Sequence, residues 1–304
     1  MKKSRLSCLI QNCFITSFLT LAVPCGLHAD NHYGIEKTAP APERIISLGQ
    51  TITERIYLLG ADRNLIADTV YCVQPEDAKH KEKVGTLIQA NLEKIVALKP
   101  DLVIATNMAR PKQLRKLKDL GIRLVQFSYP KNFSEMCRQF LELGEILGKK
   151  KKAKEIIDNT EKEVAAIRMK TRDLPKKRVF IQLGIKPLHA VTGESFLNDY
   201  IKFGGGENIA LNEGRGTYSR EKVLKGNPEV IIISTMGSSE GETGKKEKEA
   251  WMKYGSIDAV KDKNVYIVNP DKLCSPTPIT FVEALTEIAK MIHPDPDKPE
   301  KCLK

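Results

Sequence analysis

Side chains that commonly do chemistry are sparse in this chain of 304 residues, and they do not cluster. His32, His80, His189 and His293 stand far from one another, and none forms a recognised metal-binding motif with a carboxylate. The Gly-Lys-Ser/Thr motif of a phosphate loop is absent. The glycines at 204–206 follow a predicted helix, whereas a phosphate loop precedes one, so they indicate a helix stop. The absence of these motifs lowers the expectation of an enzyme.

Cysteine usage and charge exclude several further classes of protein. Of the seven cysteines, Cys72, Cys137, Cys274 and Cys302 lie beyond the N-terminal segment, with no Cys-x-x-Cys pair and no zinc-type spacing. Four scattered cysteines do not make a disulfide framework in a chain this long. The formal net charge is +11, and the lysines are spread along predicted helices. That distribution indicates a solvated face, so we expect no nucleic-acid partner.

The N-terminal segment, residues 1–29, has the pattern of a signal peptide. The only charged residues before Asp30 are Lys2, Lys3 and Arg5, and an apolar run follows at about 14–23. Small residues then lead to Ala29, so we expect export to the periplasm and cleavage after that residue. Lipid attachment at Cys25 is the alternative, and a buried N-terminal helix is a third interpretation.

Beyond a short polar linker, apolar strands alternate with amphipathic helices, and this predicts parallel sheets covered by helices. In the first half the expected strands are 44–48, 65–69, 102–106 and 123–127, with helices at 52–59, 92–98 and 112–120. In the second half the expected strands are 178–183, 230–234 and 264–268, with helices at 196–203 and 280–292. Between the halves, residues 134–172 contain no strand candidate. Their apolar residues recur at helical spacing, which predicts a short helix running into a long one.

An internal repeat relates the two halves. Residues 92–104 and 220–232 share a glutamate, a lysine, a proline and an acidic residue in the same register, with a constant offset of 128. Arg44 and Arg178 open the first strand of each half in the same way. We therefore expect two α/β lobes of similar construction.

These motifs resemble the class III periplasmic solute-binding proteins of ABC importers, which carry cobalamin, ferric siderophores or haem. The resemblance covers about Glu43 to His293, and its second-half motifs look most like the cobalamin-binding member. The segments that carry it are 44–48, 53–54, 59–60, 84–85, 91–103, 177–180, 205–209 and 219–224. The family's fold is α/β, with two lobes of mainly parallel sheet flanked by helices and joined by one long rigid helix. The implied parts are an N-terminal lobe at 43–132, a helical linker at 133–173, a C-terminal lobe at 177–293 and a flexible tail at 294–304.

The resemblance also implies a docking role for two acids. In the family, one glutamate at the tip of each lobe meets arginines on the two subunits of the permease dimer, and these glutamates match Glu93 and Glu221. Paired acids suit a two-fold symmetric partner, because opposite charges steer docking and fix orientation. The alternative is that each acid only favours the N-terminus of its own helix. We expect a monomer with no enzymatic activity and no intrinsic cofactor.

Ligand-cleft residues are expected on the loops that follow the strands. The candidates are Tyr71, Cys72, Leu87, Met108, Arg110 and Tyr129 in the first lobe, and His189, Arg215, Tyr218, Met236 and Cys274 in the second. Aromatic rings suit bulky ligands and arginines suit carboxylates. A tyrosine, histidine or cysteine among them is a possible axial ligand for iron or cobalt. For the two cysteines, ordinary packing of buried thiols is the alternative.

The expected function is capture of a metal chelate, either a ferric siderophore or a corrinoid, for delivery to an ABC importer. Leu87 and Tyr218 stand where the cobalamin-binding member has tryptophans, which departs from the corrinoid pattern. Arg110 and Arg215 suit an anionic siderophore. The alternatives are a haem-binding member of the same family, an enzyme on the related chelatase-like fold, and a structural protein of the envelope.

Overall fold

The computed structural model describes residues 40–214, 216–235 and 242–294. The predicted signal peptide, most of the predicted tail and the cleft candidates Arg215 and Met236 lie outside the described residues. Within those three ranges, no helix combines the length and the apolar character needed to cross a membrane.

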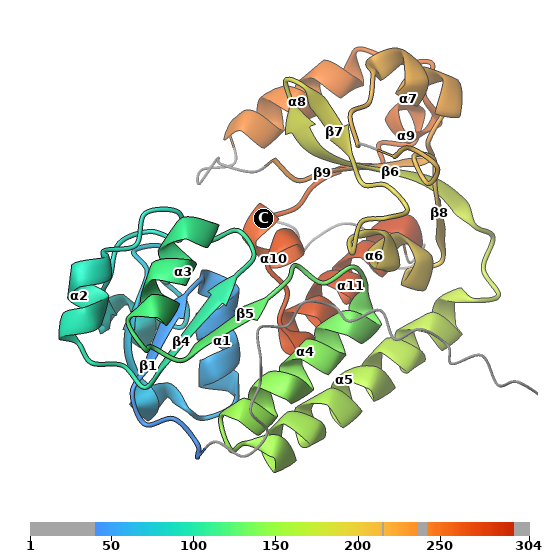
Figure 1. Cartoon of the computed structure of the whole chain (residues 1–304). Coiled ribbons are helices and arrows are strands. Elements are labelled where there is room, and N and C mark those ends of the chain that lie inside the picture. The colour runs from blue at the N-terminus through green and yellow to red at the C-terminus, as the bar shows by residue number, and fades with distance from the viewer. Residues whose placement is uncertain (1–39, 215, 236–241, 295–304) are drawn as a thin grey trace, which may run out of the picture. The chain divides into compact units, whose positions relative to one another are not determined.

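The first half of the chain forms a parallel sheet of five strands in the order β3-β2-β1-β4-β5. Figure 1 labels β1, β4 and β5 of this sheet. Its strands are β1 (Ile45–Leu48), β2 (Leu65–Asp68), β3 (Glu82–Lys83), β4 (Leu102–Thr106) and β5 (Leu124–Phe127). Its helices are α1 (Gln50–Leu58), α2 (Leu92–Ala97) and α3 (Pro111–Asp119), with short 3-10 helices η1 (Asp62–Asn64) and η2 (Glu76–His80). β1 is buried at every position, as expected for a parallel sheet covered on both faces. We call this sheet with its helices the first lobe.

The second half forms a sheet in the order β10-β9-β6-β7, and β8 also pairs with β6. Its strands are β6 (Lys177–Ile185), β7 (Leu188–Ala190), β8 (Gly206–Asn208), β9 (Val230–Ile233) and β10 (Val265–Ile267). Its helices are α6 (Asn198–Phe203), α7 (Arg220–Gly226), α8 (Glu242–Met252) and α9 (Asp258–Lys261). β7 is antiparallel to β6 and the other pairings are parallel, so the sheet is mainly parallel. We call this the second lobe.

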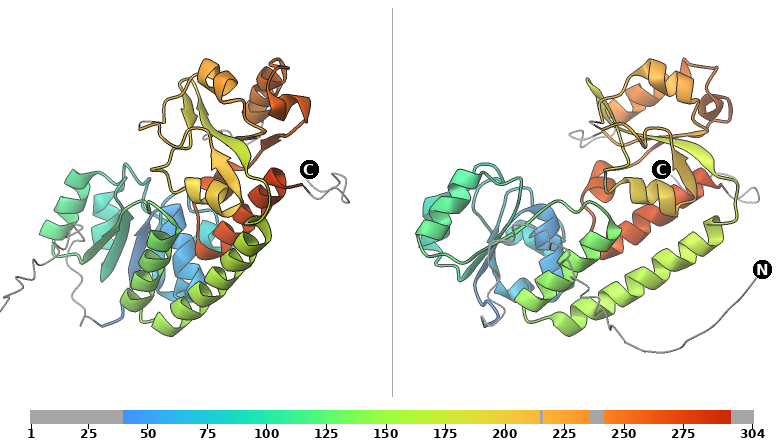
Figure 2. Two further views of the ribbon diagram at one scale, coloured as in Figure 1. Left: turned by 90° about the vertical axis from the view of Figure 1, so that its right-hand side faces the viewer. Right: turned by 45° about the vertical axis from the view of Figure 1, so that its right-hand side comes forward.

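Two helices connect the lobes where a short helix running into a long one was predicted. α4 (Phe133–Ile146) and α5 (Lys150–Thr171) are separate, and Gly148, with φ of 67°, lies in the turn between them. They lie side by side in Figures 1 and 2, and a methyl group on Gly144 would overlap the side chain of Ala153. The second of them is the long one: its 22 residues span about 33 Å at 1.5 Å per residue.

The chain returns through α10 (Pro270–Cys274) and α11 (Pro278–Ile292), and α11 packs along α5 (Figure 2). Phe281 of α11 is fully buried at the centre of a group of aromatic rings. Its ring centroid lies 4.6 Å from that of Tyr200, 4.7 Å from Phe133 and 5.6 Å from Phe196. These rings belong to α6, α4 and the segment just before α6, so the aromatic cluster ties the connecting helices to the second lobe.

The internal repeat predicted from the sequence is matched by an equivalent hydrogen bond in each lobe. Arg44 Nε donates to the carbonyl oxygen of Lys99 at 3.1 Å, and Arg178 Nε donates to that of Asn227 at 2.8 Å. Lys99 and Asn227 are 128 residues apart, and both have positive φ, of 47° and 40°. In each lobe, therefore, an arginine at the start of the first strand donates to the left-handed residue just after the equivalent helix.

Candidate functional site

The carboxyl edge of the first sheet exposes large apolar side chains on its loops. Tyr71, after β2, and Met108, after β4, are each 63% exposed, and Tyr129, after β5, is 46% exposed. Val70 and Val73, on the loop after β2, and Ile88, on the loop after β3, are exposed apolar residues as well. Single exposed apolar residues are ordinary, but several on neighbouring loops of one edge indicate an interaction surface. Arg110, the residue before α3, is also exposed here.

Two first-lobe candidates lie deeper than expected. Cys72 is fully buried, and its Sγ lies 3.2 Å from the hydroxyl oxygens of both Thr53 and Thr69. This burial agrees with the alternative interpretation, ordinary packing of a buried thiol, and contact of Cys72 with a ligand stays a prediction. Leu87 is half-buried and packs against the first-lobe core.

Two of the described second-lobe candidates, His189 and Tyr218, are half-buried and lie close to the sheet. His189 lies in β7, opposite Gly184 of β6, and forms a bridge with Thr217. Tyr218 packs its ring 5.7 Å from that of Phe180, and burial raises the pKa of its phenol. Tyr218 therefore contributes to the second-lobe core as well as to the loop surface.

Tyr129 and Cys274 are brought together across the lobes. The Tyr129 hydroxyl donates to the carbonyl oxygen of Cys274 at 2.8 Å, and its ring meets Phe196 edge-on at 6.3 Å. Burial raises the pKa of the phenol. This contact joins the loop after β5 to α10, so two of the predicted residues lie at one junction.

Sequence reasoning missed Arg55, which lies at the same junction. It is 4% exposed, its Nη2 donates to the carbonyl oxygen of Pro276 at 3.2 Å, and burial lowers the pKa of its guanidinium to about 10. None of the ion pairs within the described ranges includes it. A charged residue at its place in α1 is expected to face solvent, so nothing in the local sequence indicates that Arg55 is buried. At neutral pH it is a buried cation beneath the contact of Tyr129 with α10.

The Cys274 thiol is expected to react slowly with alkylating reagents, because burial raises its pKa to about 11. At pH 8 its thiolate population is then about two orders of magnitude below that of an unperturbed cysteine. Mass spectrometry of the iodoacetamide-treated native protein should show slow modification at pH 8 and much faster modification at pH 10. A short cysteine-containing peptide is the control, and modification of Cys274 at the peptide's rate at pH 8 would contradict this environment.

Glu93 and Glu221 occupy equivalent places in the two lobes. Each is the second residue of its helix, α2 or α7, and each is exposed. The side chains of Asn91 and Ser219 cap the two helices by accepting a backbone N–H. The backbone N–H of Glu221 and the Ser219 hydroxyl lower the pKa of the Glu221 carboxyl, so this acid also stabilises its own helix start. Helix capping and partner docking are compatible roles for an exposed acid.

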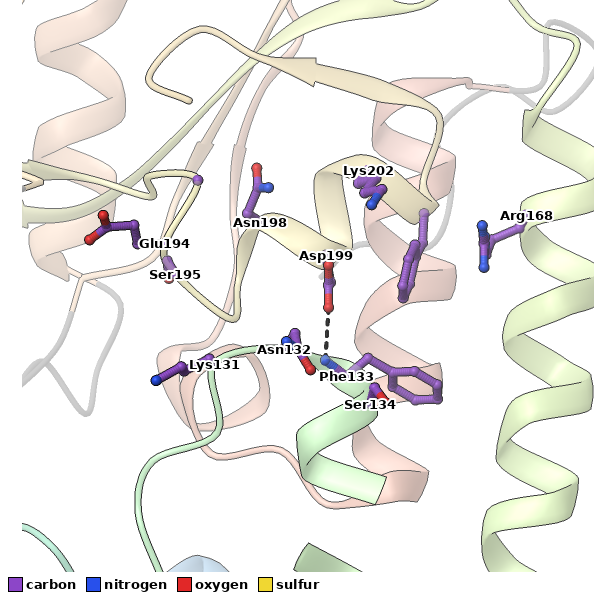
Figure 3. A pocket seen from close by; sticks show the side chains of 12 residues that line it. Lys131, Asn132, Phe133, Ser134, Arg168, Glu194, Ser195, Asn198, Asp199 and Lys202 are labelled. Carbon is purple, nitrogen blue, oxygen red and sulfur yellow. Dashed lines mark hydrogen bonds between the residues drawn. The ribbon is translucent and has the colours of Figure 1, made fainter. Parts of the chain in front are cut away.

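A surface pocket of about 850 Å³ lies elsewhere, between the start of α4, α5 and α6 (Figure 3). Asp199 Oδ2 accepts the backbone N–H of Phe133 at 2.7 Å, and the Arg168 guanidinium lies 4.7 Å from the centroid of the Phe203 ring. The lining residues are Lys131, Asn132, Phe133, Ser134, Arg168, Gly193, Glu194, Ser195, Asn198, Asp199, Lys202 and Phe203. None of the predicted cleft residues is among them, so this pocket is distinct from the predicted cleft.

Metal-binding clusters and a hydrolase motif are two features associated with chemistry. Among the described residues, no group of three or more His, Cys, Asp or Glu side chains is placed to hold a metal ion. Sequence reasoning also passed over a Gly-x-Ser-x-Gly match at 237–241, the spacing around the nucleophile of many hydrolases. That segment lies outside the described residues.

Comparisons with known proteins give consistent matches. The family model described as periplasmic binding protein matches residues 45–272. An ABC transporter substrate-binding lipoprotein of Bacillus subtilis is 30% identical over 264 residues, which cover 84% of this chain and 81% of the relative. A vitamin B12-binding protein of Vibrio parahaemolyticus is 30% identical, covering 82% and 88%. A crystal structure described as a possible iron-binding periplasmic solute-binding protein of Staphylococcus epidermidis is 26% identical, with a TM-score of 0.73, covering 84% and 100%.

Proposed function

This chain belongs to the family of periplasmic binding proteins, which serve ABC importers, and we propose that it captures a metal chelate between the carboxyl edges of its two sheets. The relatives are binding proteins of transporters rather than enzymes, which agrees with the expectation from the sequence. The observation that carries the proposal is the exposed apolar edge of the first lobe, around Tyr71 and Met108. Such a surface favours a ligand with a large apolar face.

Among metal chelates, a corrinoid is the ligand that these features favour. A ferric siderophore that carries several negative charges requires several cations, whereas the described first-lobe edge offers Arg110 among apolar side chains. The relatives named vitamin B12-binding protein support the same choice. Leu87 presents less apolar surface than the family's tryptophan, so the corrinoid would be held by other contacts.

Haem is the second candidate, and the exposure of Tyr71 favours it. A phenol that is 63% exposed on a ligand-binding edge is available to haem iron, for which tyrosine is a known axial ligand. A ferric siderophore is the third candidate ligand, and Arg215 would then supply a second cation besides Arg110.

The remaining parts of the proposal concern export and delivery. Residues 1–29 would direct export and be removed after Ala29, or Cys25 would carry a lipid, as in a lipoprotein relative. The lobes at 43–132 and 177–293, with the linker at 133–173 and the tail at 294–304, would act as one monomer. Glu93 and Glu221 would dock the loaded protein on the permease dimer, because both are exposed acids at equivalent helix positions.

Isothermal titration calorimetry of the mature protein tests the ligand class. Cyanocobalamin, cobinamide, haemin and ferric siderophores are titrated separately, because Trp251 is fully buried in the second lobe and its emission is a poor probe of the edge. We expect one-to-one binding of one class, with the chelate recovered unchanged. Met108→Lys should weaken this binding at least about tenfold, since it places a charge on the apolar face. Ile279→Lys, at an exposed apolar position of α11, is the matched control. Absence of binding by every chelate would contradict the proposal.

A further inference from the structure

The first residue of α7, Arg220, turns its side chain inward. Its Nη2 forms an ion pair with Glu247 Oε1 of α8, and its guanidinium carbon lies 4.4 Å from the centroid of the Trp251 ring. Glu247 is 5% exposed and Trp251 is fully buried. Arg220 itself is half-buried, so a charged residue directly beside the exposed Glu221 reaches into the second lobe.

Gln182 of β6 completes the arrangement. Its Nε2 donates to Glu247 Oε1 at 2.9 Å, and its Oε1 accepts the indole N–H of Trp251 at 2.7 Å. We call Arg220, Glu247, Gln182 and Trp251 the Arg220 cluster. It fixes the start of α7 to both α8 and β6 through side chains with defined hydrogen-bonding geometry.

The first lobe anchors the equivalent helix differently. The residue 128 positions before Arg220 is Leu92, which is half-buried and packs against the first-lobe core. The neighbouring acids, Glu93 and Glu221, nevertheless occupy the same helix position. The helix that carries Glu93 is therefore anchored by apolar packing of its first residue. The helix that carries Glu221 is anchored by an ion pair of its first residue, stacked on the Trp251 ring.

We propose that the Arg220 cluster positions Glu221 for its contact with a cationic surface on the permease. α7 has only seven residues, and a helix this short does not hold its own shape without tertiary contacts. A guanidinium fixed by a carboxylate on one side and an indole face on the other leaves little rotational freedom at the first turn. Arg220 is thus a positioning residue that acts through Glu221, and the inference rests on the docking role proposed above.

The test variant must not leave a buried charge unpaired. Arg220→Ala alone strands the carboxylate of Glu247, which is a destabilising change in itself. The double variant Arg220→Ala with Glu247→Gln removes both charges and keeps an acceptor for Gln182. Because Trp251 is the only tryptophan in the chain, its emission reports whether the cluster has been opened. Arg220→Lys keeps the charge and is expected to recover part of the lost affinity.

Affinity for membrane vesicles from the producing organism is measured for fluorescently labelled protein, in a double-mutant cycle with Glu221→Gln. The cluster variant should bind about tenfold more weakly than wild type. In the Glu221→Gln background it should cause no further loss, whereas in a Glu93→Gln background the tenfold loss should persist. Calorimetric affinity for the chelate should be unchanged throughout.

Two results would overturn the inference, and they are distinguishable. An equal loss in the presence and absence of Glu221→Gln would show that Arg220 acts on the fold and not through Glu221. If Glu221→Gln alone leaves vesicle binding unchanged, the docking role itself is contradicted, and the inference fails with it.

Discussion

Reversing the charge of Glu93 and Glu221 together, to lysine, is expected to abolish ligand uptake while ligand affinity stays at the wild-type value. Both acids are exposed at the second position of a capped helix, and they are related by the internal repeat. In the proposed docking, a lysine at each position would convert attraction to a cationic permease surface into repulsion, and such like-charge juxtaposition costs several kcal/mol. Uptake of radiolabelled chelate by cells that carry the variant, with calorimetry on the same purified variant, measures both quantities.

The matched control reverses two exposed acids on other helices, Asp119 of α3 and Glu163 of α5, to lysine. It changes the net charge by the same amount, so its uptake should remain close to wild type. Normal uptake by the Glu93 and Glu221 variant would exclude these acids from docking.

Phe281→Ala should destabilise the protein by about 3–5 kcal/mol, the usual cost of removing a buried phenylalanine. The side chain is fully buried and meets rings from α4, α6 and the segment before α6, so its loss leaves a cavity where three elements join. Urea unfolding of wild type and variant gives the difference in the free energy of unfolding.

Ile279→Ala on the same helix is the control, because Ile279 is 43% exposed and should change stability little. A loss of less than about 1 kcal/mol for Phe281→Ala would mean that the aromatic cluster relaxes around the vacancy. The central role of that cluster in joining the connecting helices would then be wrong.

The fold was largely predictable because its strands are buried on both faces. β1, β4 and β9 are short apolar runs bounded by turns, and parallel packing explains both their composition and their burial. β3 was missed because its two residues, Glu82 and Lys83, carry no apolar pattern. The reversal between α4 and α5 was missed because both helices bury an apolar face, so the helical spacing continues through Gly148.

The candidate site was predictable to the level of loops, and less so to the level of side chains. Exposure of Tyr71 and Met108 follows from their places after buried strands. For Cys72 the sequence left cleft contact and buried packing open, because its contact with Thr53 spans 19 residues and no local pattern reports it. The burial of Arg55 likewise depends on Pro276, which is 221 residues away in the chain.

Hydrogen–deuterium exchange of the protein, free and saturated with the chelate that calorimetry identifies, tests the central claim most directly. A ligand held between the two sheet edges should slow exchange on loops of both lobes, at residues 70–73, 86–89 and 107–110 in the first and 185–189 in the second. Protection confined to the segments that line the pocket of Figure 3, 131–134 and 193–203, would place the ligand outside the proposed cleft and contradict the account.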